Sequence, residues 1–135
     1  MSSIKNSAPA RQTSRKLALT AVVVDIALVL IFVLIGRRNH DEGFTIAGTL
    51  TTWWPFLAGL AIGWLVSRGW RKPLGLVVPG IVIWLATVAV GMLLRLASNQ
   101  GAQPSFIIVA TAVLGAFLLG WRALAILLVR RRREG

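Results

Sequence analysis

The segment from Leu17 to Ile35 constrains this chain most, because it is apolar almost throughout and carries a single acid, Asp25, near its middle. As a helix, a run of this length crosses a hydrocarbon core of ~30 Å. A carboxylate at that depth costs roughly 2.5–3.5 kcal/mol, whereas each Leu, Ile, Val or Phe returns roughly 0.3–0.6 kcal/mol. The segment is therefore expected to insert into a membrane despite its acid.

The composition of the whole chain points to one small membrane domain. Only 14% of the 135 residues are charged and the mean hydropathy is +0.76, whereas soluble domains contain roughly 25% charged residues. The absence of Cys excludes a disulfide, a thiolate metal site and a Cys nucleophile. With one His and four acids, a multi-ligand metal centre is not expected. We therefore expect neither a metal nor a cofactor.

The chain has a formal net charge of +11, which in a soluble protein would suggest a nucleic-acid partner. Here the basic residues stand in short runs between apolar segments, the pattern of charge that flanks membrane spans. We therefore expect no nucleic-acid partner. The basic tails are expected to lie against anionic lipid head groups.

The predicted fold is all-α: an integral membrane four-helix bundle made of two helical hairpins. Residues 1–16 are expected to be a disordered basic tail, residues 17–129 the transmembrane domain and residues 130–135 a second basic tail. Apolar length and the flanking charges place the four spans at about 17–35, 50–67, 74–94 and 105–129.

The distribution of Lys and Arg predicts the orientation of the bundle. Eleven of the 15 basic residues fall in the two tails and the 68–72 turn, and three fall in the other two connections. The positive-inside rule then puts both termini in the cytoplasm, with the protein multi-pass in the cytoplasmic membrane of the cell. Trp53 and Trp54 would form an aromatic belt at the outer interface, and Trp64 and Trp70 one at the inner interface.

Asp25 and Arg122 are the two charged residues within the spans, and they are predicted to lie at the same depth. Asp25 follows Lys16 by nine residues and Arg122 precedes Arg130 by eight, which gives depths of about 13 and 12 Å at 1.5 Å per residue. Intramembrane charges usually face the bundle interior and pair. We therefore expect the first and fourth spans to touch there, either as a binding or proton-relay site or as a structural ion pair that fixes helix register.

Small residues mark the faces along which helices are expected to pack. Gly59 and Gly63 form a G-x-x-x-G pattern in the second span, and Ala112, Ala116 and Gly120 repeat the spacing in the fourth. Small residues at this spacing let helix backbones approach closely in lipid. Packing within the monomer is the first interpretation, and a homo-oligomer interface is the alternative.

The connection after the first span is dense in charge, with Arg37, Arg38, His40 and two acids. One interpretation is a solvated turn between helices. The other is an outward-facing anion site in which Arg37, Arg38, His40 and Arg95 gather around a carboxylate or phosphate, since the planar guanidinium fork binds both oxygens of such groups.

Several separated motifs together resemble one family. The acid in the first span is followed by GRRNH, then PF at the start of the second span, GMLLR at the end of the third and GWR late in the fourth. In this order they are similar to the domain-of-unknown-function 3054 family of small prokaryotic membrane proteins, over roughly residues 17–125. The resemblance implies a four-helix integral membrane protein and supplies no activity. The matching positions are Asp25, Gly36, Arg37, His40, Pro55, Phe56, Gly91, Arg95, Trp121 and Arg122.

Three functional hypotheses remain from the sequence. The first is a membrane-embedded structural or interaction protein whose polar residues set helix packing. The second is a small transporter or channel subunit that uses Asp25 as a proton- or ion-coupled site. The third, an enzyme acting on lipid head groups, has the least support, because the sequence shows no paired carboxylates, activated Ser or metal cluster.

Overall fold

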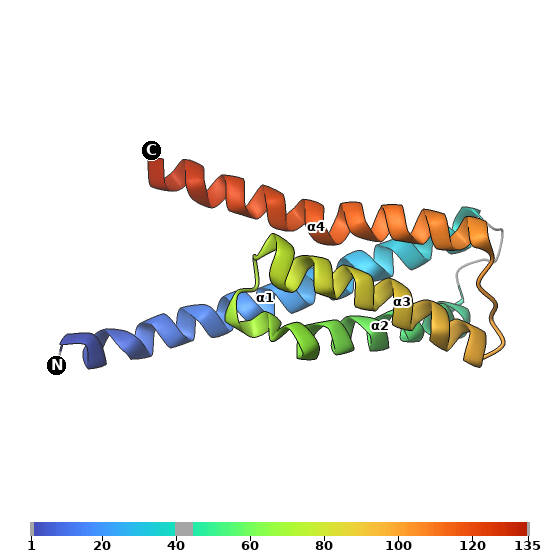
Figure 1. The fold of residues 1–135 in the computed structure, drawn as a ribbon, viewed down its shortest axis with the longest axis horizontal. Helices are drawn as coiled ribbons and strands as arrows, with labels where there is room; N and C mark the ends of the chain where they lie inside the picture. The colour runs from blue at the N-terminus through green and yellow to red at the C-terminus, as the bar shows by residue number, and fades with distance from the viewer. Residues whose placement is uncertain (1, 40–44, 135) are drawn as a thin grey trace.

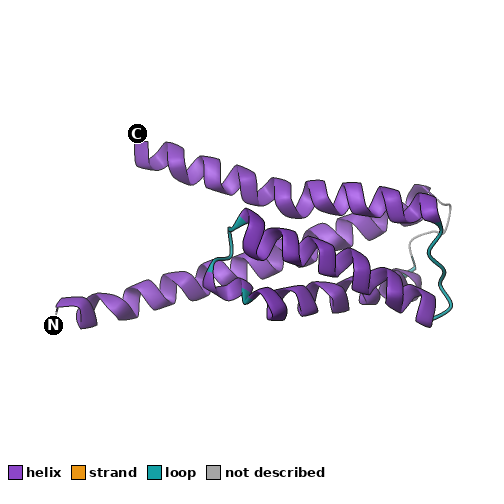
Figure 2. Cartoon of the chain, viewed as in Figure 1, coloured by secondary structure: helices purple, strands orange, loops and turns teal. Residues whose placement is uncertain are grey.

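The computed structural model describes residues 2–39 and 45–134 and contains four long helices (Figure 1). They are α1 (Ser2–Asn39), α2 (Ile46–Ser67), α3 (Val82–Ala97) and α4 (Pro104–Glu134). The described residues contain helices, turns and loops but no strand (Figure 2). Four apolar stretches are long enough to cross a membrane: Ser14–Arg38, Ile46–Ser67, Leu76–Ala97 and Pro104–Arg132. The predicted all-α, four-helix class is confirmed.

Both termini lie at one end of the bundle, together with the turn between α2 and α3 (Figure 1). The connection between α3 and α4 lies at the opposite end. The most extensive helix–helix contact is between α2 and α3, and α1 and α4 pack against this central hairpin and against each other. The bundle is therefore organised around the central α2–α3 hairpin.

The close contact between α2 and α3 follows from the two glycines of α2. A Cβ atom at Gly59 would lie 2.8 Å from the carbonyl oxygen of Ala86 and 2.9 Å from the Cα of Thr87. A Cβ at Gly63 would lie 2.8 Å from the Cα of Ile83. Only glycine allows the two backbones to approach this closely, as expected for small-xxx-small packing in lipid.

The ends of the outer helices differ from the sequence prediction. Helix α1 begins at Ser2, so that residues 2–16, which the sequence predicts to be disordered, are helical, and α4 continues through the basic tail to Glu134. Once a long span has formed, each further residue adds a hydrogen bond without a new nucleation step. Both helices therefore project beyond the α2–α3 turn (Figure 1).

The third span is not one regular helix from residue 74. A short helical turn, η1 (Gly69–Arg71), follows α2, and the segment η2 (Leu76–Ile81) then leads into α3. Within η2 the backbone of Val78 is extended, with φ −124° and ψ 117°. Val78 precedes Pro79, whose ring disfavours the helical conformation in the residue before it, so regular α-helix begins only at Val82.

The apolar core runs along the centre of the four helices. Near the α3–α4 connection it contains an aromatic trio in which Phe32 lies 5.5 Å from Phe56 and 6.1 Å from Phe106 between ring centroids. The Phe32 and Phe56 rings meet edge to face, a preferred geometry for aromatic pairs. The three rings pack against one another at that end of the bundle.

Candidate functional site

The centre of the polar interior is an ion pair between α1 and α4. Both nitrogens of the Arg122 fork donate to the Asp25 carboxylate, Nη1 to Oδ1 at 2.9 Å and Nη2 to Oδ2 at 2.8 Å. Both side chains have 0% exposure. Such a parallel, two-bond contact is the strongest arrangement that arginine and a carboxylate form, and it fixes the relative orientation of the two groups.

Two tryptophans complete the coordination of the carboxylate. Trp64 from α2 donates its indole N–H to Oδ2 of Asp25 at 2.9 Å, and Trp121 from α4 donates to Oδ1 at 2.8 Å. The Arg122 guanidinium carbon also lies 4.9 Å from the ring centroid of Trp121 and 5.9 Å from that of Trp64, within the range of a cation–π contact. The two indoles therefore bind the anion through their N–H groups and the cation through their ring faces.

The remaining bonds of Arg122 connect the pair to the α2–α3 turn. Its Nε donates to the carbonyl oxygen of Pro73 at 2.9 Å, and its Nη1 also donates to the carbonyl oxygen of Leu118 at 2.9 Å. The polar cluster therefore joins α1, α2, the turn and α4. Since Pro73 belongs to the turn, the pair lies close to that turn.

This arrangement determines what the Asp25 carboxylate can do chemically. A carboxylate has about four lone-pair sites, and Asp25 accepts four hydrogen bonds, two from Arg122 and one from each indole. Its acceptor capacity is filled by fixed protein donors, and the side chain is fully buried. The geometry therefore suits a structural junction better than a site that exchanges protons or ligands.

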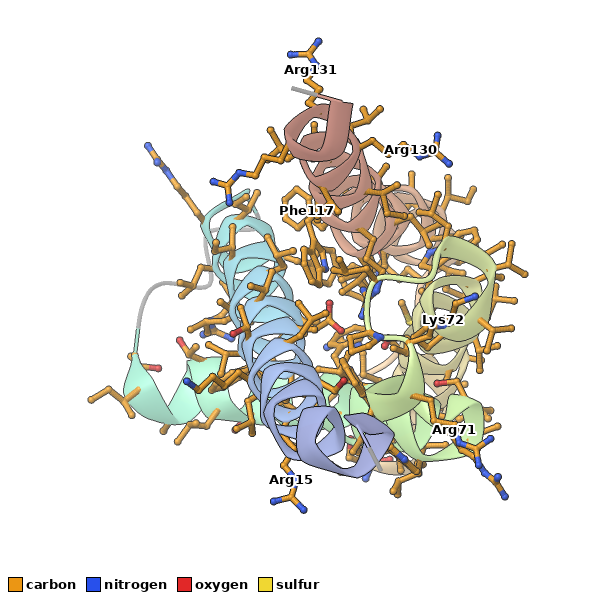
Figure 3. All side chains as sticks on the ribbon, turned by 90° about the vertical axis from the view of Figure 1, so that its left-hand side faces the viewer. Arg15, Arg71, Lys72, Phe117, Arg130 and Arg131 are labelled. Atoms are coloured by element: carbon orange, nitrogen blue, oxygen red, sulfur yellow. The ribbon has the colours of Figure 1, made fainter. Side chains whose placement is uncertain are left out.

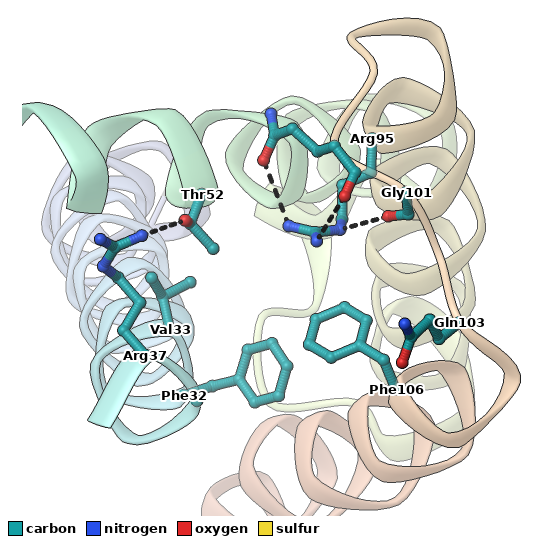
Figure 4. A pocket seen from close by; sticks show the side chains of 10 residues that line it. Phe32, Val33, Arg37, Thr52, Arg95, Gly101, Gln103 and Phe106 are labelled. Atoms are coloured by element: carbon teal, nitrogen blue, oxygen red, sulfur yellow. Dashed lines mark hydrogen bonds between the residues drawn. The ribbon is translucent and has the colours of Figure 1, made fainter. Parts of the chain in front are cut away.

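A pocket of about 250 Å³ lies at the other end of the bundle, and Asp25 and Arg122 are not among its lining residues. Arg37 from α1 and Arg95 from α3 lie on opposite sides of it, and Phe32 and Phe106 form its apolar part (Figure 4). The remaining lining residues are Val33, Gly36, Thr52, Gln100, Gly101 and Gln103. The pocket thus combines two cations, several neutral polar groups and two aromatic rings.

The two arginines of this pocket are held by contacts within the protein. Arg95 donates from Nε to the carbonyl oxygen of Gly101 at 3.0 Å and from Nη1 to Oε1 of Gln100 at 3.2 Å. Its guanidinium carbon lies 4.7 Å from the ring centroid of Phe106. Arg37 donates from Nη1 to Oγ1 of Thr52 at 3.0 Å, which links α1 to α2. These contacts orient both guanidinium groups at the pocket.

A comparison of the sequence with protein families matches most of the chain. The family model described as "Protein of unknown function (DUF3054)" matches residues 22–125. The chain belongs to the DUF3054 family. No curated protein and no solved structure matches the chain. The family match covers Asp25, Arg122 and both pocket arginines of the DUF3054 chain, and it assigns no activity to them.

Two of the four predicted anion-site residues are brought together in the DUF3054 structure. Arg37 and Arg95 line the same pocket, whereas Arg38 is exposed and is not among the lining residues. His40 lies outside the described residues. Three polar residues that were not predicted from the sequence, Thr52, Gln100 and Gln103, also line this pocket.

The small residues of α4 do not pack as the α2 glycines do. Ala112 and Ala116 are exposed, and a Cβ at Gly120 would meet no atom within 4 Å. The close contact of α4 is made instead by Gly115, which faces the indole of Trp84 at 3.0 Å from the added Cβ. Packing of the Ala112, Ala116 and Gly120 stripe inside the monomer is therefore not observed.

The roles of Trp64 and Trp121 were also missed. Trp64 was predicted to lie in the inner aromatic belt together with Trp70, but Trp64 is 7% exposed and Trp70 is 47% exposed. The belt interpretation is wrong for Trp64 because its N–H is used by Asp25. The number of lone pairs on the carboxylate could have indicated these donors. Arg122 uses only half of the lone-pair sites of Asp25, so two further hydrogen-bond donors were needed near it.

Proposed function

We propose that this DUF3054 protein is a multi-pass integral protein of the prokaryotic cytoplasmic membrane with a structural or interaction role. In this proposal both termini are cytoplasmic, and the Asp25–Arg122 pair is a structural junction that fixes how α1 and α4 meet the central hairpin. The observation that carries the proposal is the complete coordination of a fully buried carboxylate by Arg122, Trp64 and Trp121.

The transport hypothesis makes different demands on the same residues. A carboxylate that couples ion or proton movement must be reached by water or substrate from at least one side, because its protonation has to change during the cycle. Trp64 and Trp121 occupy the positions from which a water molecule would approach the Asp25 oxygens. The pocket at the loop end has other lining residues. The geometry therefore favours the structural role.

Proteoliposomes that contain a pH-sensitive dye provide the test of this role. Wild-type protein and Asp25→Asn are reconstituted in equal folded amounts, and proton flux is measured under an imposed gradient. The structural role predicts the same flux as protein-free vesicles for both proteins, with a lower yield of folded Asp25→Asn. Proton flux that is present in the wild type and absent from the folded variant would establish a coupled site instead.

A second candidate function is supported by the pocket at the loop end. Two guanidinium groups beside two phenyl rings (Figure 4) are suited to a small organic anion with an aromatic or apolar body, since arginine binds carboxylates through both oxygens. In this proposal the protein binds such an anion at the outer face of the membrane.

Benzoate is a suitable probe for the pocket, with neutral benzamide as its matched control. Binding is measured by the rise in melting temperature of the purified protein. The proposal predicts stabilisation by benzoate, little by benzamide, and loss of the benzoate effect in Arg37→Gln. Equal effects of the two compounds, or an unchanged benzoate effect in the variant, would contradict an anion site.

A further inference from the structure

A second basic feature lies at the α2–α3 turn, in an open hollow of about 510 Å³. Three cationic side chains line it, Arg68, Arg71 and Lys72, and no acidic side chain is among its lining residues. Figure 3 views this end of the molecule and shows Arg71 and Lys72 on the turn, apart from Arg130 and Arg131 at the end of α4. The hollow therefore concentrates positive charge at one defined place on the bundle.

The turn that carries these cations is held in a fixed shape. The amide of Arg71 donates to the carbonyl oxygen of Arg68 at 3.0 Å, and that of Lys72 donates to the carbonyl oxygen of Gly69 at 3.3 Å. Gly69 packs directly beneath the ring of Trp64, with no room for a Cβ. The three cations are therefore displayed on a scaffold that is attached to the buried junction, and not on a loose tail.

Arg68 adds a second, independent observation. It ends α2 in the left-handed conformation, with φ 52° and ψ 51°, and its amide donates to carbonyl oxygens of the last turn. Helices commonly end this way with glycine, because the conformation is unfavourable for residues that carry a Cβ. An arginine at this position lowers the stability of the turn, and its side chain lines the hollow.

An apolar surface continues directly from the hollow along the third span. Leu76, Val77 and Val78 also line the hollow and are 39%, 67% and 52% exposed. Trp70, in the same turn, is 47% exposed, as expected for an indole at a membrane interface. Cations beside exposed apolar side chains match a molecule that has an anionic head and a hydrocarbon chain.

We propose that the hollow is a binding site for one anionic phospholipid. The phosphate lies among Arg68, Arg71 and Lys72, and an acyl chain follows Leu76, Val77 and Val78 into the hydrocarbon. Basic pockets between membrane helices are suited to anionic head groups, and each cation near the surface contributes about 1 kcal/mol. The inference rests on the proposed membrane location, whereas it does not depend on the role of Asp25.

Titration of the purified full-length protein in detergent tests the site. Phosphatidylglycerol or zwitterionic phosphatidylcholine is added, and retained lipid is counted by native mass spectrometry. Two triple variants remove the same charge from the same end of the protein. One changes Arg68, Arg71 and Lys72 to Gln, and the matched control changes Arg130, Arg131 and Arg132 to Gln.

The site predicts one saturably bound phosphatidylglycerol and weak binding of phosphatidylcholine. The turn variant should bind phosphatidylglycerol about 100-fold more weakly, or more weakly still, because three contributions of about 1 kcal/mol each correspond to about fivefold apiece. The tail variant should bind as the wild type does. Equal losses in the two triple variants would show diffuse attraction to a basic surface and would overturn the proposal.

Arg68→Gly separates binding from folding. Glycine accepts the left-handed conformation, so the variant should melt at the same or a higher temperature while it binds phosphatidylglycerol about fivefold more weakly. Unchanged lipid affinity in this folded variant would overturn the assignment. Displacement of the lipid by millimolar glycerol phosphate would also overturn it, because the acyl chain would then contribute nothing.

Discussion

Replacing Asp25 by Asn keeps the size of the side chain and removes its charge, so it isolates the contribution of the ion pair. The variant leaves Arg122 fully buried without an opposite charge, although its Nε–Pro73 and Nη1–Leu118 bonds remain possible. In addition, the new amide nitrogen is a donor placed among the donors of Arg122, Trp64 and Trp121. Removing one partner of a buried pair typically costs about 3–5 kcal/mol.

The bonds that the uncharged indoles donate to the same carboxylate give an internal scale for this value. Hydrogen bonds between membrane helices contribute on average about 0.6 kcal/mol and at most about 1.7 kcal/mol, because the unfolded state within the membrane also finds partners. Trp121→Phe removes one such bond to Asp25 and keeps an aromatic ring. We therefore expect Asp25→Asn to lower the free energy of unfolding by about 3–5 kcal/mol and Trp121→Phe by about 0.6–1.7 kcal/mol.

Reversible unfolding in mixed micelles, with increasing mole fraction of a denaturing detergent, provides the measurement. Thr20→Val is the matched control, since it changes an exposed polar side chain of α1 whose bond is to the carbonyl oxygen of Lys16 in its own helix. The control should change stability by less than about 0.5 kcal/mol. The reasoning is refuted if Asp25→Asn unfolds at the same detergent fraction as this control.

Other parts of the bundle give three further expected outcomes. Gly59→Ala should destabilise the protein by about 1–3 kcal/mol, because the added Cβ would meet backbone atoms of Ala86 and Thr87 at 2.8–2.9 Å, an overpacked contact. Gly120→Ala should leave stability unchanged or raise it by up to about 1 kcal/mol, because the added Cβ meets nothing within 4 Å and alanine favours helix. Equal melting temperatures for Gly59→Ala and Gly120→Ala would contradict the packing described. Arg95→Gln should loosen the α3–α4 connection and speed amide hydrogen exchange at residues 98–103, because Arg95 donates hydrogen bonds to Gln100 and Gly101 there. Unchanged exchange would show that other contacts hold this loop.

The four long apolar helices could be predicted from the sequence because a helix that crosses a bilayer needs about 20 consecutive apolar residues. Their exact bounds could not. Charge marks where a helix leaves the hydrocarbon but not where it ends, and α1 and α4 both continue past their flanking cations. The break at Val78 was missed for a different reason: the first turn of a helix tolerates Pro79, but the effect of its ring on the preceding residue decides the geometry.

The meeting of Asp25 and Arg122 followed from their being the two charged residues inside the spans, since isolated charges in lipid pair. The positions of the indoles were harder to predict. Whether Trp64 faces the bundle interior depends on how α2 is rotated about its axis, and α2 is apolar on all sides, so its sequence does not mark an inward face. Gly59 and Gly63 fix this rotation by turning toward α3. Combined with the lone-pair count of a carboxylate, that rotation would have identified Trp64 as a donor to Asp25.

The central claim, that Asp25 and Arg122 form a structural junction, is tested most directly by their coupling energy. A double-mutant cycle in a lipid bilayer compares Asp25→Asn, Arg122→Gln and the double variant, which leaves neither charge buried alone. We predict that the double variant is more stable than the sum of the two single losses implies, with a coupling of about 2–3 kcal/mol, within the range for contacting residues. Strictly additive losses would contradict the account.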